Sequence, residues 1–194
     1  MITRMLRQLL KNQRGFTLIE VLIAVAIGGA IAGVGSMATR QVMTETVRNN
    51  NHEVAVRQAQ NAGRWVTLDT QMAQNVLVGD TDGFPLTLTW QDWDDPEEEI
   101  PPDEYQVVYS LEEVEGVLKL KREHYINIVD ESTPPDATTY VAKYIDSYPE
   151  KTNCTFSEPV LTFTVTATVG GGSLQEMSET RIYEIVHRAT AASS

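Results

Sequence analysis

An apolar run from Phe16 to Ala38, with Glu20 as its only charge, constrains this chain more than any other feature. A helix of this length covers about 34 Å, more than the roughly 30 Å of hydrocarbon in a bilayer. Residues 1–15 contain four bases and no acid. This positive charge predicts that they stay in the cytoplasm and that the chain crosses the membrane once, with its body outside.

Glu20 lies five positions into the apolar run. An unpaired acid in hydrocarbon costs about 2.5–3.5 kcal/mol or more, so it is expected to have a partner or a function. A secretory signal peptide explains it less well, because such a signal has a shorter apolar stretch of about 7–15 residues and needs no acid. A second alternative is that the carboxylate only extends toward the lipid headgroups.

The sequence Arg-Gly-Phe-Thr-Leu-Ile-Glu, residues 14–20, resembles the class III signal of type IV pilins and type II secretion pseudopilins. In that family a prepilin peptidase and N-methyltransferase cuts after the glycine and methylates the new amino terminus. The resemblance implies cleavage between Gly15 and Phe16, methylation of Phe16 and retention of the apolar helix. It also implies that Glu20 pairs with the amino group of Phe16 on a neighbouring subunit, which would neutralise two charges in a low-dielectric medium.

Helical spacing continues beyond the apolar run and predicts one helix from Phe16 to Val78. Its first half, residues 16–38, is expected to span the membrane and to serve assembly, and its amphipathic half, residues 39–78, to pack on the body. The apolar positions of that second half are Ala55, Ala59, Ala62, Val66, Ala73 and Val76. Four glycines interrupt the first half, at 28, 29, 33 and 35. They indicate either a local loosening of the helix during assembly or a close helix–helix contact.

A second resemblance covers residues 58–73. There Asn61-Ala-Gly-Arg-Trp65 precedes Asp69-Thr-Gln-Met-Ala73, an order similar to that of larger minor pilins and J-type minor pseudopilins. Many major pilins also have a proline where this chain has Met37. Both features favour a minor subunit, at the tip or at initiation of a fibre.

Residues 79–194 change from helical to strand periodicity and are expected to form a globular head. Strands are predicted at 86–90, 105–111, 117–128, 160–169 and 182–187, hairpin loops at 112–116 and 170–173, and a short helix at 140–148. The predicted fold is α+β, with the long N-terminal helix packed on an antiparallel β-sheet head. The domains are then a leader (1–15), the two helix halves (16–38 and 39–78) and the head (79–194).

The head is strongly acidic, with 23 acids against seven bases, so nucleic acid is not an expected partner. Eight of these acids lie in residues 91–104. This segment is interpreted as a solvated loop, or as a calcium site with Asp92, Asp94 and Asp95 as ligands, helped by Asp80 and Asp82. The sequence contains no motif of a catalytic triad, zinc protease or nucleotide-binding loop, and one cysteine, Cys154. No cofactor and no enzymatic activity are predicted.

The sequence as a whole is interpreted as that of a pilin-like structural subunit. The resemblance implies that it is inserted in the inner membrane with its head outside and is then assembled into a type IV pilus or a type II secretion pseudopilus. Implied partners are the prepilin peptidase, other pilin or pseudopilin subunits, membrane lipid, and an inner-membrane assembly platform with its cytoplasmic ATPase motor. The alternative is a membrane-anchored binding or enzymatic domain, for which the N-terminal helix is only a tether.

Overall fold

The computed structural model describes residues 15–92, 103–128, 133–146, 151–171 and 175–188. It contains two compact units, residues 1–46 and residues 47–194. One helix, α2 (Leu18–Met72), contributes to both, and antiparallel sheets follow it. The predicted α+β fold class, with a long N-terminal helix packed against antiparallel sheets, is confirmed.

In the first unit, every described residue is exposed. This part of α2 is long and apolar enough to cross a membrane. Its hydroxyl groups are satisfied within the helix, because each donates a hydrogen bond of 2.8–3.0 Å to the carbonyl four residues earlier. The donors are Ser36, Thr39, Thr44 and Thr46. The segment therefore presents an apolar surface and no unpaired hydroxyl.

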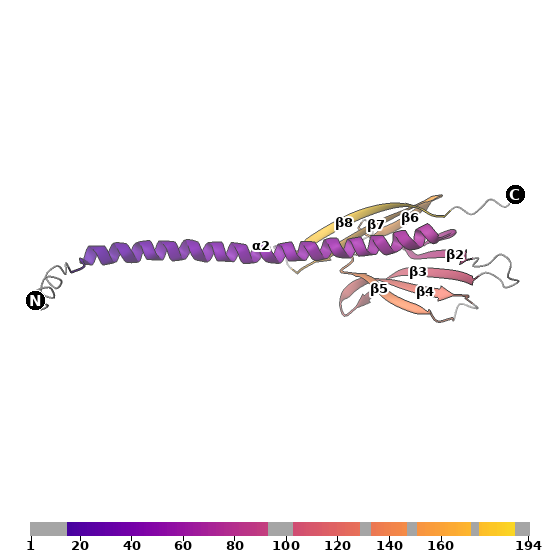
Figure 1. Cartoon of the computed structure of the whole chain (residues 1–194), viewed down its shortest axis with the longest axis horizontal. Helices are drawn as coiled ribbons and strands as arrows, with labels where there is room; N and C mark the ends of the chain where they lie inside the picture. Colours follow the sequence, from indigo (N-terminus) through magenta and orange to yellow (C-terminus); the bar gives the residue numbers. More distant parts are fainter. Residues whose placement is uncertain (1–14, 93–102, 129–132, 147–150, 172–174, 189–194) are drawn as a thin grey trace, which may run out of the picture. The chain divides into compact units, whose positions relative to one another are not determined.

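The second unit contains two antiparallel sheets (Figure 1). The five-stranded sheet has the order β1-β2-β3-β4-β5 and consists of β1 (Asn75–Gly79), β2 (Gly83–Asp92), β3 (Asp103–Val114), β4 (Val117–Ile126) and β5 (Ala137–Lys143). The three-stranded sheet has the order β6-β7-β8 and consists of β6 (Asn153–Ser157), β7 (Val160–Val169) and β8 (Met177–Val186).

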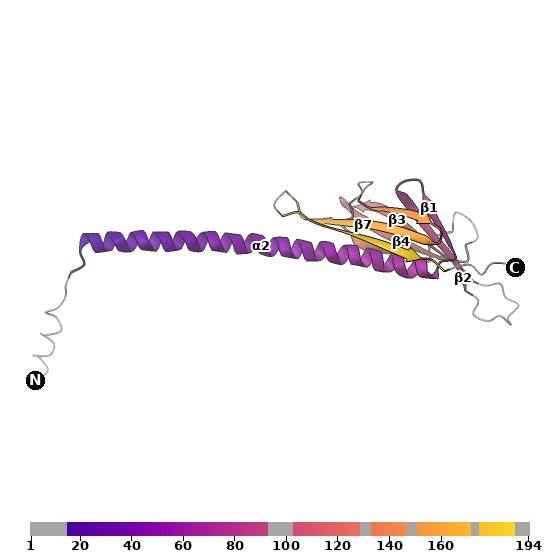
Figure 2. The same cartoon turned by 90° about the horizontal axis from the view of Figure 1, so that it is seen from above.

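Within this unit both sheets lie on the same side of α2 (Figure 2). The helix turns small, fully buried side chains toward them, namely Ala55, Ala59, Ala62 and Val66. Small residues let a helix approach a sheet closely: a Cβ atom at Gly63 would lie 2.0 Å from the ring of Tyr183 on β8. The buried apolar residues of the helix and of both sheets form one core cluster.

The helix ends six residues earlier than predicted, at Met72 rather than Val78. Residues 75–79 form β1, whose Val76 pairs with Leu88 of β2. The amide of Gln74 already donates to the carbonyl of Thr89, at 2.8 Å. The sequence prediction was wrong here because the apolar spacing of Val76 continues the helical pattern, whereas pairing with β2 determines the backbone.

The five predicted strands correspond to β2, β3, β4, β7 and β8. The loop predicted at 112–116 was too long, because residues 112–114 continue β3 and only Glu115 and Gly116 form the turn. The second loop connects the paired strands β7 and β8, and its residues 172 and 173 lie outside the described residues. The tight turn at Glu115 and Gly116 has φ angles of 57° and 73°, which suit a two-residue hairpin. The predicted helix at 140–148 was wrong: residues 137–143 form β5, paired with β4. Strands β1, β5 and β6 were not predicted, because each is short and is defined mainly by its neighbour in the sheet.

Candidate functional site

Glu20 forms a reciprocal cap at the start of α2. Its Oε2 accepts hydrogen bonds from the amide and the hydroxyl of Thr17, both at 3.2 Å, and its own amide donates to Thr17 Oγ1 at 3.3 Å. This is a capping box, in which a threonine and a glutamate three residues later satisfy otherwise free amides. The positive end of the helix dipole also favours the carboxylate there.

Gly15, Phe16 and Thr17 precede the helix, and all three are exposed. The peptide bond between Gly15 and Phe16 thus lies outside helical hydrogen bonding and only four residues before Glu20. The structure brings the three predicted site residues into one short segment, while their individual roles stay predictions. Sequence reasoning missed Thr17, although its spacing from Glu20 is that of a capping box.

Apolar side chains surround this segment. Phe16, Leu18, Val21, Leu22 and Val25 line a hollow of about 550 Å³ on the helix surface. The hollow lies on the same two turns of the helix as Glu20, although Glu20 does not line it. An apolar hollow of this kind can receive side chains of another helix, and an acid in an apolar segment can pair with a cation.

In the second unit, a buried polar cluster connects α2 to the five-stranded sheet. Arg122 of β4 donates to Asp69 of α2 through Nε at 2.7 Å and Nη2 at 3.0 Å, a bidentate ion pair. The hydroxyl of Tyr109 on β3 donates to the same carboxylate. The guanidinium of Arg122 also lies over the ring of Trp65, 5.1 Å from its centroid.

The protonation states in this cluster follow from burial and charge. Burial raises the pKa of Tyr109 far above its ordinary value, and the negative charge of Asp69 and the hydrogen bond to it raise it further. Burial alone would lower the pKa of Arg122, but the hydrogen bond and attraction to Asp69 outweigh it, so that this pKa is raised. The cluster thus contains a charged arginine and a neutral tyrosine on one carboxylate, and it fixes the helix on the head.

The residues of the second resemblance, 58–73, belong to this packing. Gly63 receives the Tyr183 ring, Trp65 contacts Arg122, and Asp69 accepts the bonds of Arg122 and Tyr109. In this chain the pattern is therefore explained by attachment of the helix to the head. The partners of Asp69 were not predicted, because they lie 40 and 53 residues away in the sequence.

The calcium hypothesis cannot be followed in the structure, because Asp94, Asp95 and the side chain of Asp92 lie outside the described residues. Among the described residues, no group of three or more His, Cys, Asp or Glu could hold a metal ion. Cys154 is buried, and burial raises the pKa of its thiol far above the ordinary value, which disfavours the reactive thiolate.

One comparison with known proteins gave a match: the profile of the prokaryotic N-terminal methylation motif matches residues 10–36. The matched segment contains Gly15, Phe16 and Glu20 and is typical of type IV pilins and pseudopilins, so the motif implies processing by a prepilin peptidase. Neither the curated proteins nor the solved structures gave a match.

Proposed function

We propose that this protein is a structural subunit of a type IV pilus or a type II secretion pseudopilus. In this proposal the chain is cleaved between Gly15 and Phe16, is methylated on Phe16 and is stored in the inner membrane by the first part of α2. It then enters the fibre when Glu20 pairs with the Phe16 ammonium of a neighbouring copy or related subunit. The observation that carries the proposal is a single acid, within the methylation motif, in the otherwise apolar and exposed segment of residues 16–38.

The capping box leaves room for this pairing. Both hydrogen bonds to the Glu20 carboxylate use Oε2, and within the described part of the chain Oε1 accepts none. The helix start thus satisfies one oxygen during storage, and the other oxygen is free for an ammonium group. An isolated ammonium in hydrocarbon is also costly, so docking stabilises both partners.

In this proposal, different parts of the chain have different roles. Residues 16–38 would lie in lipid and later among neighbouring helices, a change in which the apolar surface stays out of water. Residues 1–15 would be the removed leader. The rest of α2, ending at Met72, would attach to a head whose 16 excess negative charges keep the fibre soluble and oppose DNA contact. The narrower proposal of a minor subunit is supported by the resemblance of residues 58–73.

The proposal is tested by Glu20→Gln and Glu20→Ala in the full chain, with Glu53→Gln as the matched control. Glu53 is exposed on the same helix and pairs with Arg57 at 2.5 Å, a surface contact of little energy. Cleavage and membrane insertion should be unchanged in all three variants. The amount of both Glu20 variants in sheared fibres should fall at least about tenfold, because leaving one member of a buried ion pair alone costs about 3–5 kcal/mol.

If the Glu20 variants enter fibres as well as the wild type does, the proposal that Glu20 is needed for assembly is contradicted. The tether hypothesis makes the opposite prediction: the head would keep its activity after Glu20→Ala, and no fibre would contain the chain.

A further inference from the structure

Three large apolar side chains are exposed on one side of α2 in the second unit. Trp65, Leu68 and Met72 are 40 %, 47 % and 46 % exposed and lie on successive turns of the helix. We call these three residues the ridge. Between residues 52 and 64, the exposed positions of the helix are all polar, namely His52, Glu53, Arg57, Gln60, Asn61 and Arg64. A contiguous apolar patch with a polar surround is typical of a protein interaction surface.

Trp65, the first residue of the ridge, is held in place before any partner binds. The guanidinium of Arg122 lies over the Trp65 ring. Two hydrogen bonds to Asp69 fix the position of this guanidinium, which in turn restricts the Trp65 side chain. A side chain that is already ordered loses less entropy on binding. Tryptophan and arginine are also the residues most enriched among those that dominate binding energy.

The ridge has positive charge beside it. Arg64 is exposed next to Trp65 and forms no ion pair with the residues that the structure describes. This stands out because the head as a whole is strongly acidic. A partner that carries acids around apolar contacts would therefore complement this surface.

The same chain offers such an acidic surface at one end of the five-stranded sheet. The β1–β2 turn lies between the paired residues Gly79 and Gly83, and the β3–β4 turn lies between the paired residues Val114 and Val117. Because Leu86 pairs with Tyr109, both turns lie at the same end of the sheet. The turns contain Asp80, Asp82 and Glu115, and Glu112 and Glu113 lie beside them at the end of β3. Glu112 also pairs with Lys121 of β4 at 3.3 Å, so its charge is partly neutralised. We call these five acids the acidic edge.

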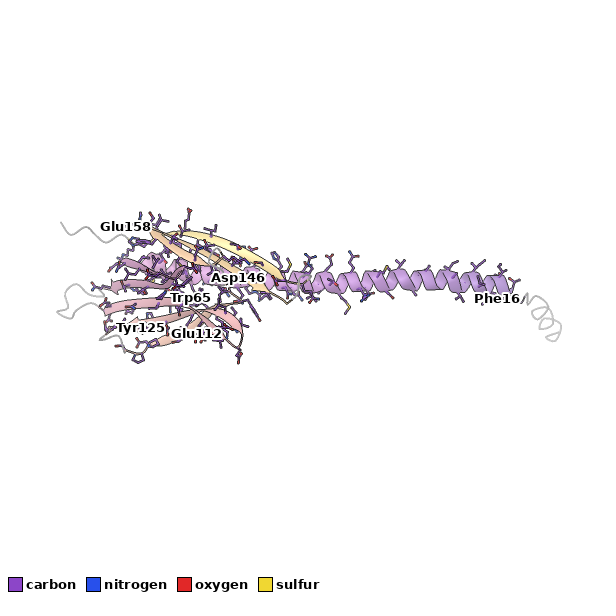
Figure 3. All side chains as sticks on the ribbon, turned by 180° about the vertical axis from the view of Figure 1, so that it is seen from behind. Phe16, Trp65, Glu112, Tyr125, Asp146 and Glu158 are labelled. Carbon is purple, nitrogen blue, oxygen red and sulfur yellow. The ribbon has the colours of Figure 1, made fainter. Side chains whose placement is uncertain are left out.

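The ridge extends toward the opposite end of this sheet. Shortly after Met72, Gln74 bonds to Thr89 and Gln91, near the end where Trp90 pairs with Tyr105. Figure 3 shows Trp65 on the helix, and Glu112 and Tyr125 toward the two ends of the sheet. One head therefore presents an apolar, basic surface and an acidic surface at different places.

We propose that the ridge of one copy receives the acidic edge of a second copy. The inference rests on the proposed fibre function and adds that copies of this chain lie next to each other in the fibre. Because the two surfaces differ, the contact is head-to-tail rather than a symmetric dimer. The net negative charge of both heads does not prevent it, because salt at physiological strength screens charges beyond about 8 Å.

The test places a photo-crosslinking amino acid at position 68 of the full chain in cells, with position 60 on the same helix as the control. Fibre incorporation is measured in the same samples. Position 68 should give crosslinked dimers, and mass spectrometry should locate the link in residues 79–83 or 112–116 of the second copy. The double variant Glu113→Lys and Glu115→Lys should lower the yield several-fold, whereas crosslinking from position 60 should give no such dimer.

The outcomes separate the two proposals. Normal incorporation without a dimer, or with a link to another protein or to another part of the head, overturns the ridge contact and leaves the fibre function standing. Absence of the chain from fibres contradicts both.

Discussion

Two glycines on the same helix show how different the two units are. At Gly33, in the first unit, a Cβ atom would meet nothing within 4 Å, whereas at Gly63, in the second unit, it would lie 2.0 Å from the Tyr183 ring. The first position has no packing partner within the described chain, and the second is filled by the protein's own side chain. The same contrast holds for apolar residues, which are exposed along the first unit and buried in the core of the second.

This difference indicates which interactions each region needs. The head has a core of its own and a buried ion pair that attaches its helix, so its stability is a property of one molecule. The apolar part of α2 can bury its surface only in lipid or against other chains. The open space at the glycines is compatible with both interpretations made from the sequence, a looser helix and a close helix–helix contact.

The largest expected effect is the loss of the ion pair that attaches α2 to the head. Asp69→Ala should lower the free energy of unfolding of the head by about 3–5 kcal/mol, because Arg122 would be left half-buried without its partner. Urea unfolding of the full chain in detergent micelles, followed by tryptophan fluorescence, measures this loss. Glu53→Ala, which removes a surface ion pair, should cost less than about 1 kcal/mol. Equal effects of the two variants would contradict the role given to Asp69.

The glycine comparison itself can be tested with a matched pair of variants. Gly63→Ala should destabilise the head by about 1–3 kcal/mol, because the added methyl group must displace Tyr183. Gly33→Ala should leave the unfolding of the head unchanged, since it lies outside that unit and only raises local helix propensity. Urea unfolding measures both variants. If Gly63→Ala leaves the free energy of unfolding of the head unchanged, the contact between Gly63 and Tyr183 is looser than the structure shows.

Alkaline pH should weaken the head through Tyr109. Its pKa is raised in the folded state, so the unfolded chain loses this proton first, at about pH 10. The contribution of protonated Tyr109 to the free energy of unfolding is complete below pH 10. Above pH 10 it decreases, by up to about 1.4 kcal/mol per pH unit. Unfolding curves between pH 9 and pH 11 test this, with Tyr109→Phe as the variant whose slope should be smaller. An unchanged slope in Tyr109→Phe would assign the effect to the other tyrosines or to Cys154, whose pKa burial also raises.

The smallest effect is expected at the start of α2. Thr17→Val removes the hydroxyl of the capping box and should destabilise the first helical turn by about 1 kcal/mol, whereas Thr17→Ser should keep it. Hydrogen exchange of the amides of residues 18–20 in micelles measures this local change, and unfolding of the head should not respond. Equal protection in both variants would mean that the capping box is not formed in the membrane environment.

The sequence was informative where a pattern is local. Alternation identified the strand at 160–169 to the residue, the loop predicted at 112–116 contains the observed turn at Glu115 and Gly116, and the motif around Glu20 was identified directly from the sequence. It was uninformative where distant partners decide the structure. Pairing with β2 ended the helix at Met72, pairing with β4 made a strand of residues 137–143, and the partners of Asp69 come from two strands far along the chain.

The account depends most directly on the state of the amino terminus in assembled material. Mass spectrometry of the N-terminal peptide, from membranes and from sheared fibres of the same cells, measures that state. We expect the fibre fraction to contain chains that begin with methylated Phe16, and the leader to be found only on a precursor in the membrane. A chain that keeps residues 1–15 throughout, and that never occurs in fibres, would contradict the account.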